Sequence, residues 1–374
     1  MSSPLVDLHT PIDPKWHENA SKRFASPFMG MKHDRISVDP MMLSHAAVVC
    51  GKTIREFYEQ PEMGAHCVAA ASQFYDLLPV THWYFSLPWL TELGVTMRYM
   101  NEMPPVIEHP IVHDLEAIDR IEVPDTAAME KGATAQQLFH VNDYIIEHMP
   151  KMFIPMTYTS DLTGAAAQLC GVEDFIMWTM VEEKSAHTLV QKYMETAVNG
   201  AEVMANRYGM AMIATGSVLG NNDIFSDQAV NDYSIKYLHD FVKSAMNKGA
   251  GPQVFYHLCG NHETDYKLFK ERLVWSPFTI MHVGYKGRDV FPSDLLVEEF
   301  GTMGTCMGSV DTKIMAFSNP KAVYEQARDQ ILKGRDSPSG YILGTACEVP
   351  PYSPPENIQA LVQASKDFGT YGTW

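Results

Sequence analysis

The sequence predicts an α/β protein whose main part is a (β/α)8 barrel, the TIM-barrel fold, preceded by an N-terminal helical cap. From about residue 66 the chain alternates about seven to eight times between short apolar segments, typical of buried strands, and longer segments typical of helices. No Asn-Gly or Asp-Gly hairpin turn joins two apolar segments. Strands separated by helices pair in parallel, so we expect a cap at residues 1–65 and a single barrel unit at residues 66–374.

The predicted cap lacks the alternation that follows it. Four prolines interrupt residues 1–65, and residues 42–58 carry apolar side chains at helical spacing. We therefore expect a helix at residues 42–58 and a cap that packs on the main domain.

The predicted barrel elements follow in order. Helix 185–208 is the clearest, because Gly209 stands where a left-handed residue ends a helix. The final helix is expected to begin with a capping box, Ser353–Glu356, with proline at its first position. Strands are expected at residues 95–99, 152–156, 210–214, 254–259, 278–281 and 341–346, and the other helices at residues 67–78, 135–148, 162–169, 233–246, 265–273 and 320–332.

Composition restricts the classes of partner. The formal net charge is −17, and lysine and arginine form no long runs. This argues against nucleic acid or an anionic membrane as the main partner. No apolar segment is long enough to span a bilayer, and the first residues lack the basic and apolar regions of a secretory leader. We therefore expect a cytoplasmic protein, in which a cysteine near a histidine is more often a ligand or nucleophile than half of a disulfide.

A metal site is predicted where two strands end. His257 and Cys259 lie two residues apart, so both side chains point to the same face of a strand. Cys347 ends the last predicted strand, and the carboxyl ends of parallel barrel strands share one rim. Thiolate sulfur and imidazole nitrogen are zinc ligands, so the pattern predicts a Zn²⁺ site on these three residues. The alternative is that both cysteines are buried apolar residues.

A fourth ligand is less well defined by the sequence. His282 is expected to end the next strand and is the first candidate, but it could instead contact a ligand or the substrate. Carboxylate alternatives are Glu183, Glu263 and Glu348. Of the other cysteines, Cys50, Cys67, Cys170 and Cys306 are expected to be buried apolar residues, although the segment around Cys306 is loop-like and near the rim.

Other chemistries have little support. Gly216–Gly220 lacks the Gly-Lys-Ser/Thr end of a phosphate-binding loop. The chain has no Gly-x-Ser-x-Gly motif, so a serine hydrolase is not indicated.

Several motifs resemble one known family. The segments Tyr256–Asn261 and Gly344–Ile358 resemble the uroporphyrinogen decarboxylase superfamily, and more closely its zinc-dependent corrinoid methyltransferase branch. Gly308–Asp311 is similar to the Gly-Asn-Ile-Asp element of that superfamily. Arg23-Phe24 and Asp34–Asp39 are similar to its N-terminal signature. The resemblance implies a (β/α)8 barrel of the uroporphyrinogen decarboxylase type, in which a His-x-Cys and a late Cys bind zinc.

The resemblance also implies an activity. A methyl group would move from a methoxylated small molecule to the Co(I) corrinoid (cobalamin) of a partner corrinoid protein, with zinc as a Lewis acid on the ether oxygen. The catalytic residues would be His257, Cys259 and Cys347, with His282. Aromatic residues at His82–Phe85 and Trp178 favour an aromatic methyl donor.

Three other functions stay open at this point. The first is a methylcobalamin:thiol methyltransferase of the coenzyme M type. The second is a uroporphyrinogen decarboxylase, which does not use this zinc set. The third is a corrinoid-binding or zinc-storage module, although the Asp-x-His-x-x-Gly corrinoid signature is absent. A homodimer is compatible with each of them.

Overall fold

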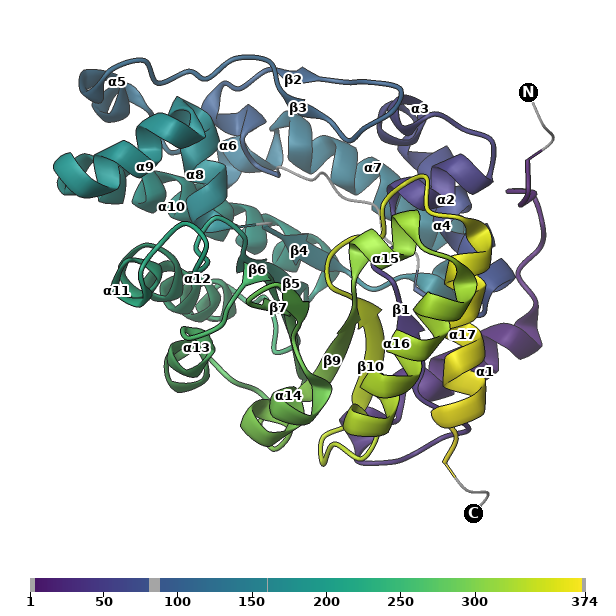
Figure 1. Cartoon of the computed structure of the whole chain (residues 1–374). Helices are drawn as coiled ribbons and strands as arrows, with labels where there is room; N and C mark the ends of the chain where they lie inside the picture. Colours follow the sequence, from purple (N-terminus) through teal and green to yellow (C-terminus); the bar gives the residue numbers. More distant parts are fainter. Residues whose placement is uncertain (1–3, 81–87, 160, 372–374) are drawn as a thin grey trace.

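A curled, mostly parallel sheet with surrounding helices forms the centre of the molecule (Figure 1). The computed structural model describes residues 4–80, 88–159 and 161–371. Seven parallel strands follow one another across the sheet in the order β1-β10-β9-β7-β6-β5-β4. This architecture confirms the predicted (β/α)8 barrel class. The strands are β1 (Ser37–Asp39), β4 (Met156–Tyr158), β5 (Met212–Ser217), β6 (Val254–Asn261), β7 (Thr279–Lys286), β9 (Thr305–Val310) and β10 (Tyr341–Thr345).

The N-terminal segment contributes to the sheet as well as covering it. Strand β1 pairs in parallel with β10, with Ser37 opposite Ile342 and Asp39 opposite Gly344. The segment expected to form a cap therefore also supplies a strand of the sheet. A strand of three residues is too short to show a periodicity of two in the sequence.

The expected helix at residues 42–58 is divided in two. Gly51 has a φ of 72°, in the left-handed region, and interrupts the helix. Thr53 then starts a new helix with a capping box to Glu56. The helices of this segment are α1 (Pro14–Ala25), α2 (Ser44–Val49), α3 (Ile54–Glu59) and α4 (Pro61–Tyr75).

A long excursion lies between α4 and β4, across the top of Figure 1. The strand expected at residues 95–99 is short, and it pairs antiparallel with a neighbour in a separate two-stranded sheet. It therefore does not belong to the barrel. The elements of the excursion are β2 (Met97–Arg98), β3 (Val106–Ile107), α5 (Leu115–Arg120), α6 (Thr126–Glu130) and α7 (Ala133–His148).

The remaining helices cover the outside of the sheet. Gly209 ends α10 with a φ of 76°, as predicted. The predicted capping box of α17 is wrong, because Pro354 holds the cap position and no side chain bonds there. These helices are α8 (Leu162–Cys170), α9 (Val172–Val181), α10 (Glu183–Tyr208), α11 (Asp227–Val230), α12 (Lys236–Asn247), α13 (Tyr266–Arg272), α14 (Ser293–Phe300), α15 (Thr312–Phe317), α16 (Pro320–Gly334) and α17 (Pro355–Phe368). None of the helices within the described ranges is both long and apolar enough to cross a membrane.

Strand β7 continues beyond the position where the sequence suggested its end. It runs to Lys286, turns at Gly287 with a φ of 63°, and pairs antiparallel with β8 (Asp289–Val290). His282 therefore lies in the middle of a strand and not at its end. This places it below the rim of the barrel, opposite His257 on β6.

The side chains that point into the barrel form two regions. Toward the strand beginnings they are apolar, and we call this the lower lumen (Phe255, Ile280, Met307 and Ile342). Toward the strand ends they are polar, and we call this the upper lumen (His257, Cys259, His282, Ser309 and Cys347). The alternate residues of β6, Tyr256 and Leu258, point outward and are fully buried.

Candidate metal centre

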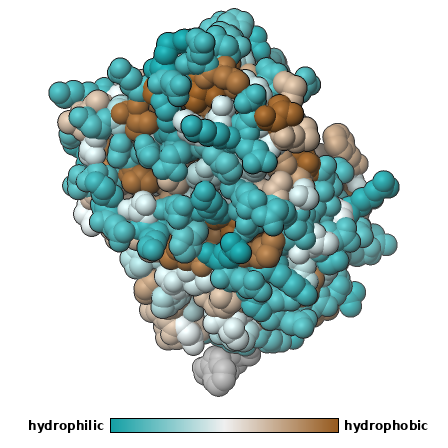
Figure 2. Space-filling view, turned by 90° about the vertical axis from the view of Figure 1, so that its left-hand side faces the viewer, coloured by the Kyte–Doolittle hydropathy of each residue, from teal (hydrophilic) through white to brown (hydrophobic). Residues whose placement is uncertain are grey.

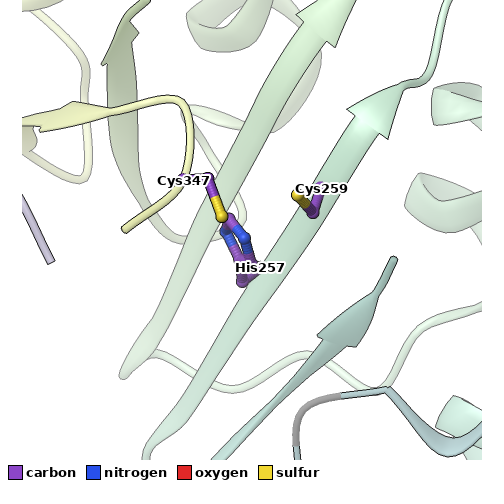
Figure 3. Close-up of side chains that lie close together, drawn as sticks. All are labelled: His257, Cys259 and Cys347. Atoms are coloured by element: carbon purple, nitrogen blue, oxygen red, sulfur yellow. The ribbon is translucent and has the colours of Figure 1, made fainter. Parts of the chain in front are cut away.

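Two segments that are not neighbours in the sheet bring three metal-ligating side chains together. His257 and Cys259 project from β6, and Cys347 follows the end of β10 (Figure 3). Their ligand atoms all lie within 4.8 Å of one another. Strands β7 and β9 separate β6 from β10 in the sheet, so the curvature of the barrel creates this contact.

Glycines let the backbone of β6 approach its neighbours. Gly216 of β5 lies opposite His257, and a Cβ atom at Gly216 would overlap the carbonyl oxygen of His257. Beyond Leu258 the pairing with β7 shifts, and Gly260 has a φ of 88°. The irregular end of β6 thus begins at Cys259, which is where a strand at a barrel rim can turn its side chain toward a ligand.

The thiols of Cys259 and Cys347 interact with each other, and this interaction moves their pKa values in opposite directions. The pKa of the Cys347 thiol lies well below its usual value, because the Cys259 thiol donates a hydrogen bond to it. The same interaction raises the pKa of Cys259, and burial raises it further. A thiolate is the form of cysteine that binds metals, so Cys347 is prepared for that role before any ion arrives.

His282 lies behind His257 and outside the group of three. Its Nδ1 atom is 2.7 Å from Nδ1 of His257, and its Nε2 atom is 3.0 Å from the hydroxyl of Ser309. Burial lowers the pKa of His282 well below the usual histidine value, and His257 adds to this effect. With both ring nitrogens engaged by protein groups, His282 supports His257 in this structure.

The carboxylates named as alternatives do not complete the group. Glu263 forms an ion pair of 3.8 Å with Lys286, and Glu183 begins α10. Glu348 is inside the protein and accepts a hydrogen bond of 3.0 Å from the amide of Ser44. Burial raises the pKa of Glu348 to about 7.

The donor set fits zinc. Two sulfur atoms and one imidazole nitrogen form a soft set of three, which leaves one position of a tetrahedron for another ligand. All three residues are half-buried and not sealed in the core. Of the remaining cysteines, Cys50, Cys67, Cys170 and Cys306 are buried free thiols. Cys306 is buried, as predicted, but its segment is not a loop, because it lies in β9 and donates to the carbonyl of Leu296 at 3.6 Å.

Three further groups near the lumen were not predicted from the sequence. Ser309 lies in the quoted segment Gly308–Asp311, and Asp39 in the N-terminal signature, but nothing in their spacing indicates a site. Tyr158 ends β4 beside the cysteines; burial raises its pKa, and the nearby charges of Cys347 and Glu348 contribute. Only the closure of the barrel brings these residues inside.

An apolar cavity of about 90 Å³ occupies the lower lumen. Its polar lining residues are Asp39 and Tyr158, and among the described residues no lysine or arginine lines it. The ring of Phe255 forms part of the wall and stacks near His257, with 6.4 Å between the ring centroids. The cavity therefore lies directly below the metal-ligating residues.

Of the aromatic residues expected to bind a substrate, the structure describes Trp178, which does not line this cavity. Trp178 is partly buried on α9 and packs against the hydrophobic core. The segment His82–Phe85 falls outside the described residues.

The fold and this site together define a (β/α)8-barrel protein with a group of three soft side chains, able to hold a metal ion, at the carboxyl ends of its strands. The model of the uroporphyrinogen decarboxylase (URO-D) family matches residues 19–368. The chain belongs to this family, which confirms the resemblance seen in its motifs.

Relatives of the chain bear the name methyltransferase. The methylated-thiol–coenzyme M methyltransferase of Methanosarcina mazei is 23% identical over 284 residues, covering 74% of this chain and 68% of that protein. The solved structure of a methyltransferase from Methanosarcina mazei covers 94% of this chain and 99% of its own, with a TM-score of 0.75 and 18% sequence identity. The structural likeness supports the fold.

Proposed function

We propose that this protein is a zinc-dependent methyltransferase that moves a methyl group from a methoxylated, aromatic substrate to the Co(I) corrinoid of a partner protein. The observation that carries this proposal is the group of His257, Cys259 and Cys347, assembled from β6 and the end of β10. When bound there, zinc supplies a Lewis acid that makes an ether oxygen a better leaving group. The reaction would take place in the cytoplasm, where thiols stay reduced.

The protein residues contribute in distinct ways. Cys347 supplies a thiolate, since its pKa is lowered. His257 and Cys259 are held by the same strand, which fixes their separation. The apolar lower lumen below them limits water near the leaving oxygen, and a low local dielectric strengthens electrostatic interactions at the site.

The cavity supports an apolar methyl donor. Its wall is formed mainly by methionine, phenylalanine and isoleucine side chains, which suit an aromatic ring better than a charged group. An engineered cavity of about 150 Å³ is large enough for benzene. A ring would therefore also occupy the upper lumen, where the metal ligands lie.

Exposed apolar side chains around the barrel mouth support a protein partner. Val218 follows β5, Phe317 ends the helix after β9, and Tyr352 follows β10; they are 41%, 88% and 58% exposed. Figure 2 shows hydrophobic patches that interrupt a hydrophilic surface on the side that is on the left in Figure 1, where α9 lies, and Met177, Met180 and Val181 of α9 are exposed. We propose that the corrinoid protein docks at this mouth. Faster methylation of protein-bound than of free corrinoid supports this; equal rates oppose it.

A second candidate is a thiol methyltransferase. The named relative from Methanosarcina mazei acts on methylated thiols and coenzyme M, and this favours it. In that reaction the thiolate of the substrate would approach the same three residues. The cavity lining favours the first candidate, because coenzyme M carries a sulfonate and no basic side chain lines the described part of the cavity.

One assay distinguishes these functions. Purified, zinc-loaded protein is mixed with cob(I)alamin and guaiacol, vanillate, methanol or dimethyl sulfide, and methylcobalamin is followed by absorbance. Methylation by a methoxyaromatic compound supports the proposal. Turnover only with methanol or the sulfide, or loss of methylcobalamin with coenzyme M, rejects the aromatic substrate. Decarboxylation of uroporphyrinogen by zinc-free protein would reject methyl transfer altogether.

A further inference from the structure

A chain of hydrogen bonds begins behind His257 and ends on the backbone of β7. Nδ1 of His257 faces Nδ1 of His282 at 2.7 Å, and Nε2 of His282 faces the hydroxyl of Ser309 at 3.0 Å. That hydroxyl donates to the carbonyl of Val283 at 2.9 Å. His282 and Ser309 are both fully buried, so water does not compete for these bonds.

The carbonyl of Val283, the last group in this series of hydrogen bonds, determines the direction of every bond in the series. A carbonyl oxygen can only accept, so the single hydroxyl hydrogen of Ser309 goes to Val283. The same oxygen must then accept a hydrogen from Nε2 of His282. A neutral imidazole protonated on Nε2 has a lone pair on Nδ1. His282 therefore accepts the hydrogen that Nδ1 of His257 donates.

The direction of these hydrogen bonds determines which ring nitrogen of His257 can bind a metal. If Nδ1 of His257 carries the hydrogen, the other ring nitrogen, Nε2, carries a lone pair. An imidazole binds a metal only through such a lone pair. We propose that His282 and Ser309 are positioning residues that hold His257 in the tautomer with an unprotonated Nε2, ready for the metal. The inference rests on the proposed zinc site and assigns a role to residues that do not touch the ion.

The alternative proton arrangement would oppose metal binding. Were Nδ1 of His282 the donor, Nδ1 of His257 would be the acceptor, and a neutral His257 would carry its hydrogen on Nε2. Ser309 would then have to donate to His282, and the carbonyl of Val283 would lose its hydrogen bond from that hydroxyl. A hydrogen bond of this kind contributes about 0.5–1.5 kcal/mol, so the arrangement that keeps it is favoured.

Zinc affinity of serine variants tests the end of the chain. We expect Ser309→Ala to weaken zinc binding about 10-fold, at the lower end of the effect of outer-shell partners of metal ligands. The matched control is Ser217→Ala, since Ser217 is also fully buried and donates to a backbone carbonyl, that of Gly220 at 2.6 Å. Affinities are measured by competition with a chelator. Equal affinity of Ser309→Ala and the control would overturn the inference.

Two histidine variants test the middle of the chain should Ser309→Ala not fold. The amide oxygen of His282→Asn can accept where Nδ1 lies, whereas His282→Leu offers no acceptor. We expect the leucine variant to bind zinc at least about 10-fold more weakly than the asparagine variant. The Co²⁺-substituted wild type and His282→Asn should have the same absorption spectrum, because the ligand set is unchanged. A changed spectrum would make His282 a ligand and reject its positioning role.

The proton positions themselves can be read by nitrogen-15 NMR of the histidine rings. We expect hydrogen on Nδ1 of His257 and on Nε2 of His282, and the reverse assignment contradicts the inference. The two proposals fail differently. A wild type that binds no zinc rejects the proposed function and this inference together, whereas normal zinc binding in all the variants rejects this inference alone.

Discussion

The upper and lower lumen are built by the same strands from different side chains. Strand β6 contributes Phe255 below and His257 above, and β7 contributes Ile280 below and His282 above. A step of two residues along a strand keeps the side chain on the same face, so each strand changes its chemistry without changing its direction. The side chains of the lower lumen form an apolar wall, and those of the upper lumen include the three metal-ligating residues. Side chains two residues apart on the same strand can therefore belong to an apolar region and to a metal-ligating region.

The largest expected effect is the loss of zinc when a ligand in the upper lumen is removed. Cys347→Ala removes one of three ligands, and we expect its zinc content to fall from one per chain to near zero, with loss of methyl transfer. Metal analysis of the purified protein measures this. The matched control is Cys306→Ala, a buried thiol on β9 outside the group, which should keep its zinc. Full zinc content in Cys347→Ala would show that the metal, if any, is held elsewhere.

The next effect concerns the lower lumen alone. Met307→Ala removes a side chain that is 1% exposed, and deletions of this kind cost about 2–5 kcal/mol of unfolding free energy. We expect lower stability in urea but an unchanged zinc content, since Met307 does not belong to the metal-ligating group. Met281→Ala is the control, because Met281 is equally buried on the outward face of β7. Loss of zinc in folded Met307→Ala, but not in Met281→Ala, would show that the two regions are not independent.

The smallest of these effects lies at the boundary between the regions. Burial raises the pKa of Asp39 to about 6. The residue borders the cavity, so part of its surface is accessible although it lies inside the protein. The folded protein therefore holds a proton that the unfolded chain has lost, and stability falls as the pH rises from about 4 to about 6.

Asp39→Asn removes this dependence. A shift of about two pKa units corresponds to about 3 kcal/mol, so the variant should gain up to that amount over wild type at pH 7 and above. The gain should shrink toward zero below about pH 4, where the Asp39 carboxyl group becomes protonated in the unfolded chain as well as in the folded protein. Urea unfolding of both proteins at several pH values measures it. A gain that is independent of pH would mean that Asp39 does not titrate in this window.

The sequence determined the class of fold, because strand and helix segments of ordinary length carry their own periodicity. The helix ending at Gly209 and the His257/Cys259 strand needed no tertiary information. It also determined which metal-ligating side chains are available. A His-x-Cys at a strand end, with Cys347 near the end of the chain, is an unusual pattern for residues of a hydrophobic core. Short or interrupted elements were not predicted from the sequence, as β1 and the break at Gly51 show.

Only the tertiary structure decided how these residues meet. The sequence could not show how far β7 extends, and so it placed His282 at the rim, whereas pairing with β6 sets it opposite His257. Ser309 had no visible role, because its partner lies on a neighbouring strand and hydrogen bonds between strands depend on register. The curvature that brings Cys347 to β6 is a property of the closed sheet, which no local segment encodes.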